Sequence, residues 1–101
     1  MIIREWRGRA RRSQADAYPR HFRERVISEL RQVPGFIGAQ LARCDLDGEV
    51  EFLVLTRWQS METIRAFAGT EVEKAVVEPG AAATLVEFDE RVRHYEVVEA
   101  V

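Results

Sequence analysis

Two histidines are the residues of this chain best suited to acid–base chemistry, because an imidazole can accept a proton near neutral pH. His21 lies beside a helical apolar stripe, and His94 directly precedes Tyr95 near the C-terminus. Each also has a structural interpretation. His21 can be a helix-flank residue, and His94 lies on the opposite face of a predicted strand from Tyr95, so only one of the two can face a given cavity. We treat both histidines as candidate catalytic bases.

Aromatic side chains supply candidate walls for a flat, apolar ligand. Trp6, Phe22 and Phe67 are the candidates, although Phe22 and Phe67 are also interpretable as core residues. Arg4 shares a predicted strand face with Trp6 and can bind a phenolate or a carboxylate, although an arginine on a short strand is more often solvated or paired across a dimer. These residues are therefore predicted to bind substrate.

The sequence does not predict disulfides, a structural metal or a cofactor. Cys44 is the single cysteine, and the two histidines lie too far apart for a recognisable zinc spacing.

The length of 101 residues predicts one domain over residues 1–101. The hydrophobic fraction of 47% and the charged fraction of 32% are typical of folded proteins and exclude low-complexity classes. No apolar stretch approaches the roughly 18 to 20 residues of a membrane span. Charges in the first ten residues also argue against a signal peptide. We expect a cytoplasmic protein without membrane contact.

Charge is unevenly distributed along the chain. Residues 1–35 hold nine Arg against four acidic residues, whereas residues 36–101 hold six basic against thirteen acidic residues. A basic segment can bind phosphate backbones, but no nucleic-acid-binding motif accompanies this one. No nucleic-acid partner is predicted.

Periodicity predicts the elements that must position these side chains. Residues 2–9 alternate as a strand, and Ser13 with Asp16 has capping-box spacing for a helix. The apolar stripe of that helix is Tyr18, Phe22, Val26, Leu30 and Val33. Proline at position 19 predicts a kink or a late helix start.

The remaining elements are predicted from turn and capping signals. They are a hairpin of strands 36–44 and 49–58, a helix from Ser60 to Ala68, a helix from Thr70 to about Glu78, and a long strand 84–98 that is bent near Asp89. The order is β-α-β-β-α-β, an α+β ferredoxin-like fold with a four-stranded antiparallel sheet. Strand residues 50–55 are apolar on both faces, so a second copy of the chain is expected to cover the free face as a homodimer.

The segment Phe52–Gly69 (FLVLTRWQSMETIRAFAG), the following Thr70–Glu73 and the terminal His94–Val97 resemble the antibiotic biosynthesis monooxygenase superfamily. The resemblance extends over nearly the whole chain. It implies a dimeric α+β barrel with a pocket between helices and sheet, and a packing role for Trp58. The superfamily holds cofactor-independent oxygenases of polyketide quinols, haem-degrading enzymes and many members without known activity, so function must be argued from the site.

The resemblance also gives a test for haem chemistry. The haem-degrading branch has an Asn on the first strand, a Trp on the helix after the strand Trp, and a coordinating His on the next helix. This sequence places Trp6, Phe67 and Val77 at or beside those three positions. Val77 offers no lone pair to iron, so haem degradation is not expected, and Val77 is instead predicted to line the pocket.

The first functional hypothesis is a cofactor-independent monooxygenase that acts on a small aromatic, phenolic or polyketide-like substrate. His94 or His21 would be its base. The alternative is a non-catalytic dimer that binds a hydrophobic metabolite in the same pocket. A third reading is a dimerisation module whose pocket Trp6 and Phe67 fill, and a cavity of roughly 300 Å³ or more would argue against it.

Overall fold

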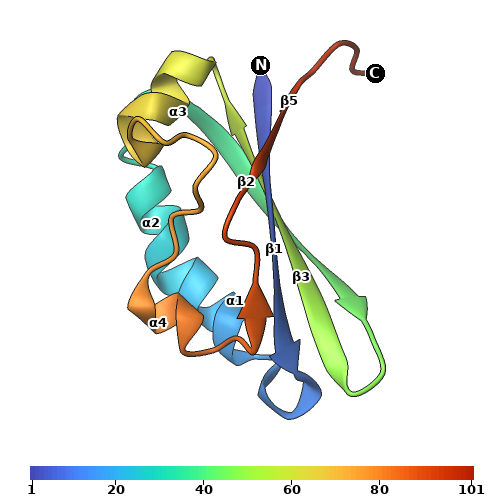
Figure 1. Ribbon diagram of the computed structural model, residues 1–101. Coiled ribbons are helices and arrows are strands. Elements are labelled where there is room, and N and C mark those ends of the chain that lie inside the picture. The colour runs from blue at the N-terminus through green and yellow to red at the C-terminus, as the bar shows by residue number, and fades with distance from the viewer.

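The fold is α+β and is described over residues 1–101 by a computed structural model (Figure 1). Its elements are β1 (Ile2–Arg11), η1 (Arg12–Gln14), α1 (Ala17–His21), η2 (Phe22–Val26), α2 (Ile27–Leu30), β2 (Phe36–Asp45), β3 (Glu49–Trp58), α3 (Met61–Ala68), α4 (Pro79–Ala82), β4 (Glu87–Phe88) and β5 (Arg93–Glu96). None of the helices is both long and apolar enough to cross a bilayer.

The sheet is antiparallel with the order β2-β3-β1-β4. β5 also pairs with β1, so β4 and β5 follow one another along the same edge of that strand. This arrangement confirms the ferredoxin-like prediction. The predicted long last strand is interrupted between Phe88 and Arg93, where the chain leaves β1. That interruption coincides with the bend predicted near Asp89.

One face of the sheet holds the core. Side chains alternate along β1 and β3, so Trp6, Val50 and Phe52 are buried against the helices, which lie on this face (Figure 1). The intervening residues Leu53 and Leu55 are only half-buried. Because every helix packs on the same side, the other face of the sheet is left free within one chain.

The first helical segment differs from the prediction at its start. Ser13 lies in the short 3₁₀ turn η1, and α1 begins after Asp16 without a side-chain cap, so the predicted capping box is wrong. Pro19 is tolerated because it lies in the first turn of α1, where backbone N–H groups have no helical acceptor. The helix continues through the π-type turn η2 into α2.

The predicted helix over residues 70–78 is not formed. This segment contains a turn, in which Lys74 N–H donates to the Glu71 carbonyl (3.0 Å), and it pairs with the chain between β4 and β5: Ala75 N–H donates to the Glu90 carbonyl (2.9 Å), and Val92 N–H donates to the Glu73 carbonyl (2.7 Å). Tertiary pairing thus replaces the local helix signal of Thr70 and Glu73. Pro79, which was expected to end a helix, instead begins α4.

The hairpin and the Ser60 helix agree with the sequence. β2 and β3 pair on either side of the turn that contains Gly48, with a register shift between Phe36 and Gly38. Ser60 and Thr63 form a capping box in which each side chain accepts from the backbone N–H of the other residue. α3 is therefore fixed directly after Trp58, and Phe67 is carried back toward the sheet.

Candidate functional site

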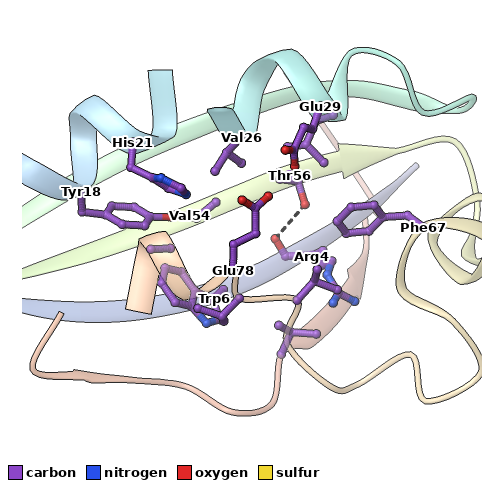
Figure 2. Close-up of a pocket in the computed structure, with 15 residues that line it drawn as sticks. Arg4, Trp6, Tyr18, His21, Val26, Glu29, Val54, Thr56, Phe67 and Glu78 are labelled. Carbon is purple, nitrogen blue, oxygen red and sulfur yellow. Dashed lines mark hydrogen bonds between the residues drawn. The ribbon is translucent and has the colours of Figure 1, made fainter. Parts of the chain in front are cut away.

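A pocket lies between the helices and the buried face of the sheet (Figure 2). It encloses about 100 Å³, and ten of its 15 lining residues are hydrophobic. A cavity of roughly 150 Å³ is enough for benzene, whereas drug-sized ligands occupy about 300 Å³ or more. The pocket is smaller than that benzene cavity, so it takes at most one aromatic ring, and a larger molecule would extend past the exposed Glu29 into solvent.

Aromatic rings form the walls of this pocket. Trp6 comes from β1, and its ring lies 5.6 Å from that of Tyr18 on α1. The Trp6 indole N–H donates to the Asp89 carbonyl (2.9 Å), so the segment between β4 and β5 fixes the orientation of the Trp6 ring. Phe67 of α3 packs on the buried Trp58 with 5.3 Å between ring centroids.

His21 projects from the end of α1 into the pocket (Figure 2). Its Nε2 is buried and has no hydrogen-bond partner in the chain. A buried polar atom without a partner costs free energy that a bound ligand can recover. The Nε2 atom of His21 is therefore the protein atom best placed to meet a polar group of a ligand.

Arg4 places a positive charge at the pocket. The residue is only 6% exposed, and its guanidinium donates to the carbonyl oxygens of Val72 (2.7 Å) and Lys74 (3.0 Å) and to His94 Nε2 (2.9 Å). No carboxylate lies within ion-pair distance, and burial lowers the pKa of Arg4 to about 10. Its guanidinium also lies 5.9 Å from the centroid of the Phe67 ring.

His94 lies on β5 opposite Arg4 and does not line the pocket. A guanidinium can only donate, so His94 Nε2 must accept, and its neutral ring carries the proton on Nδ1. Burial, reinforced by the charge of Arg4, lowers the pKa of His94, although Glu73 opposes this shift. His94 therefore holds Arg4 in this geometry, and its Nε2 is not free to take a substrate proton.

The lowered pKa of His94 predicts a pH-dependent stability. The unfolded chain binds more protons than the folded chain below the ordinary histidine pKa of about 6.5, so stability falls as pH decreases through that value. We expect the urea midpoint of the wild type to decline more between pH 7.5 and pH 5 than that of His94→Gln, whose amide oxygen can still accept from Arg4. Parallel declines would contradict this assignment, since every other titrating group is shared.

Two carboxylates also line the pocket. Glu29 extends from α2, and Glu78 precedes α4 (Figure 2). Side-chain hydrogen bonding of Glu29 to Glu78, followed by burial and the charge of Glu78, raises the pKa of Glu29. This pair was not predicted, because α4 was not expected.

The structure brings together five of the seven predicted site residues. Arg4, Trp6, His21, Phe67 and Val77 all line the pocket. His94 contacts it only through Arg4. Phe22 is corrected to a core residue, because its ring is 4% exposed and packs beside Tyr18, 6.4 Å between centroids, without reaching the cavity.

Tyr18 is a pocket residue that the sequence placed only in the core stripe. Its three-residue spacing from His21 puts both side chains on one helical face, and this was the available signal. Burial raises the pKa of Tyr18, so its hydroxyl stays protonated, and it makes no hydrogen bond within the chain. The hydroxyl is thus a further donor for a ligand.

The sequence matches a known protein family, and the fold matches several solved structures. The profile of the family described as antibiotic biosynthesis monooxygenase matches residues 1–79. A Bacillus cereus protein named for the same family superposes with a TM-score of 0.67 at 17% identity, covering 99% of this chain and 97% of that chain. No curated protein matches the sequence.

Two further solved structures share the fold. The haem-degrading protein MhuD of Mycobacterium tuberculosis gives a TM-score of 0.64 at 23% identity, covering 98% of each chain. SnoaB, a cofactor-independent oxygenase of Streptomyces nogalater, gives 0.63 at 17% identity, covering 99% of this chain and 95% of that chain. At these identities the likeness is one of fold.

Proposed function

Because this chain belongs to the antibiotic biosynthesis monooxygenase family, we propose that it is a cofactor-independent monooxygenase acting on a small aromatic, phenolic or polyketide-like substrate. The observation that carries the proposal is the buried, unpartnered Nε2 of His21 inside an aromatic pocket. SnoaB shares the fold and is a cofactor-independent oxygenase. The pocket volume of about 100 Å³ limits the part of a substrate inside the pocket to one ring at most.

The chemistry requires an electron-rich anion that can itself reduce dioxygen. His21 Nε2 takes a proton from an activated methylene, R₂CH₂, and the resulting anion passes one electron to dioxygen. Recombination forms the carbon–oxygen bond of a peroxide, which takes the proton back from His21. Loss of water then breaks the oxygen–oxygen bond. The balance is R₂CH₂ + O₂ → R₂C=O + H₂O, so no external reductant is consumed.

Haem does not suit this pocket. The haem macrocycle has four pyrrole rings, whereas the enclosed space is about 100 Å³. Val77 stands where the haem-degrading motif has its histidine, and it lines the pocket with an apolar side chain. His21 has a free Nε2, but the Tyr18 ring lies beside its imidazole, with 6.3 Å between the ring centroids.

The proposal is tested by oxygen uptake with a panel of phenols, quinols and anthrones of one to three rings. We expect uptake above the buffer rate for substrates that carry an acidic methylene beside a phenolic ring. One oxygen atom of each dioxygen should appear in the product and the other in water. Labelling with ¹⁸O₂ distinguishes this from autoxidation to peroxide. An absence of enzyme-dependent uptake over the whole panel would overturn the proposal.

A non-catalytic binding role is the second candidate, and one observation favours it. No side chain donates to or accepts from either ring nitrogen of His21, whereas an efficient base is usually oriented by a further group. Ligand binding without oxygen uptake in the same panel would select this function. The third reading, a dimerisation module whose pocket Trp6 and Phe67 fill, would be contradicted by a cavity of roughly 300 Å³ or more. The observed cavity is smaller than that.

We further propose a homodimer through the free face of the sheet. Half-buried Leu53 and Leu55 lie there beside Ile3, and Tyr95 of the neighbouring β5 is 44% exposed. A second copy packed on this face would bury these side chains in a symmetric interface. Native mass spectrometry is expected to show twice the mass of 11.6 kDa, and Leu53→Glu should shift the protein to monomer. A wild-type monomer at micromolar concentration would contradict the dimer.

A further inference from the structure

Arg4 is a buried cation without a counter-ion. It is the only Lys or Arg side chain among the buried residues, and the four ion pairs of the chain use Arg7, Arg9 and Arg43. A charge removed from water is costly unless an opposite charge accompanies it. The fold therefore maintains an unneutralised positive charge at the wall of an otherwise apolar pocket.

The partners of Arg4 hold the guanidinium in place without cancelling its charge. Two are main-chain carbonyls and the third is the neutral His94. Three of the five guanidinium N–H groups are used in this way, which leaves one on Nε and one on Nη2. A carboxylate accepts two such N–H groups at once, which is the preferred geometry for arginine.

The rest of the pocket dictates the orientation of an anionic ligand. Phe67 packs against the guanidinium, and Trp6 lies two residues along the same strand on the same face. Glu29 and Glu78 line the pocket but form no ion pair with Arg4. These carboxylates repel an anion from their side, so the acidic group of a ligand is directed to Arg4 and its ring to the aromatic walls.

We propose that the pocket selects aromatic carboxylic acids, with the carboxylate paired to Arg4 and the ring between Trp6 and Phe67. This inference rests on the proposed function, since it names the substrate class of that same pocket. The oxygenated substrate would then be a hydroxyaryl acid that also carries the activated methylene, and this methylene would reach toward His21. The carboxylate anchors the ring and takes no part in the bond changes.

Binding measured without turnover tests this inference. Under nitrogen, calorimetric titration of the wild type with benzoate and 2-hydroxybenzoate is compared with titration with the neutral benzamide and 2-hydroxybenzamide. We expect each acid to bind at least about tenfold more tightly than its amide, because the charge-assisted hydrogen bonds are lost in the amide. Equal affinity of acid and amide, or no binding of either acid, would overturn the inference.

Variants on β1 locate the effect. Arg4→Met should reduce the acid-to-amide ratio to about one, whereas Arg7→Met makes the same charge change on the opposite face of the strand and should leave the ratio intact. Arg4→Lys keeps the charge but not the fork and should give an intermediate ratio. A ratio that survives Arg4→Met in a folded variant contradicts the assignment, and the wild-type comparison decides the matter even where Arg4→Met does not fold.

The outcomes also separate this inference from the proposed function. Acids that bind selectively but give no oxygen uptake as hydroxyaryl acids would support the anion site and refute the monooxygenase. Oxygen uptake with neutral phenols that is unchanged in Arg4→Lys, together with equal binding of acids and amides, would support the monooxygenase and refute the anion site.

Discussion

Replacement of His21 by glutamine is expected to lower the rate of enzyme-dependent oxygen uptake by about two to four orders of magnitude, the usual contribution of a positioned general base. Glutamine keeps much of the size and hydrogen-bonding capacity of the imidazole but does not accept a proton at neutral pH. The imidazole Nε2 is buried in the pocket without a protein partner, so its removal breaks no hydrogen bond of the fold. The free energy of unfolding should therefore change little.

A neighbouring substitution controls for helix effects. Arg20 is exposed and directly precedes His21 on α1, so Arg20→Gln changes the same helix without touching the pocket. We expect Arg20→Gln to retain the wild-type rate. A His21→Gln variant with a rate within threefold of the wild type would exclude His21 as the base.

The pH profile distinguishes proton abstraction from a wall contact. A base is needed only while the substrate remains protonated, so the deficit of His21→Gln should shrink as the pH is raised through the pKa of the substrate. A residue that merely shapes the pocket would lower the rate by the same factor at every pH. A constant deficit would thus assign His21 to binding, in agreement with the non-catalytic alternative.

Strand patterning predicted most of the fold because alternation is a local property. The runs 2–9 and 49–58 each bury every second residue, and the observed pairing of β1 with β3 joins these two patterns in register. The Ser60 capping box was likewise predicted because all its atoms belong to four consecutive residues. Local signals with local partners were sufficient for these elements.

Elements that depend on distant partners were not predicted. The segment 70–78 carries a capping-box pattern, yet its backbone pairs with residues 90–92, and this pairing exists only once β1 has brought the last strand alongside. The same pairing positions the carbonyls of Val72 and Lys74 that hold Arg4. The anion-binding geometry therefore arises from a long-range contact that no window of the sequence contains.

The candidate site was predicted in its residue types more than in its roles. Arg4 and Trp6 were found because strand alternation places them on one face. His94 and His21 were both candidate bases in the sequence. The structure distinguishes them, because His94 accepts from Arg4 and positions it, whereas His21 Nε2 has no partner and is available as a base. The pairing of Glu29 with Glu78 depends on α4, which begins directly after Glu78. This helix was not predicted, because Pro79 and Gly80 were interpreted as the end of a helix.

Replacement of Trp58 by alanine is expected to reduce the free energy of unfolding by about 3–5 kcal/mol, a large share of the roughly 5–15 kcal/mol of a small domain. The side chain is fully buried and packs against Phe36, 5.4 Å between ring centroids, and against Phe67 at 5.3 Å. Truncation leaves a cavity beneath α3 that neighbouring side chains can fill only in part, and it removes the support of the Phe67 wall.

Trp58→Phe isolates the hydrogen-bond contribution from packing. The Trp58 indole N–H donates to Thr56 Oγ1 (2.8 Å), and Thr56 Oγ1 in turn donates to the Arg4 carbonyl (3.5 Å), so phenylalanine breaks the first contact and keeps most of the ring. We expect a loss of about 1–2 kcal/mol for phenylalanine. Urea unfolding at pH 7 and one fixed protein concentration measures both variants. A loss below about 1 kcal/mol for Trp58→Ala would show that this ring does not stabilise the core cluster that it forms with Leu30, Ile64 and Val72, and that Phe67 is held by other contacts.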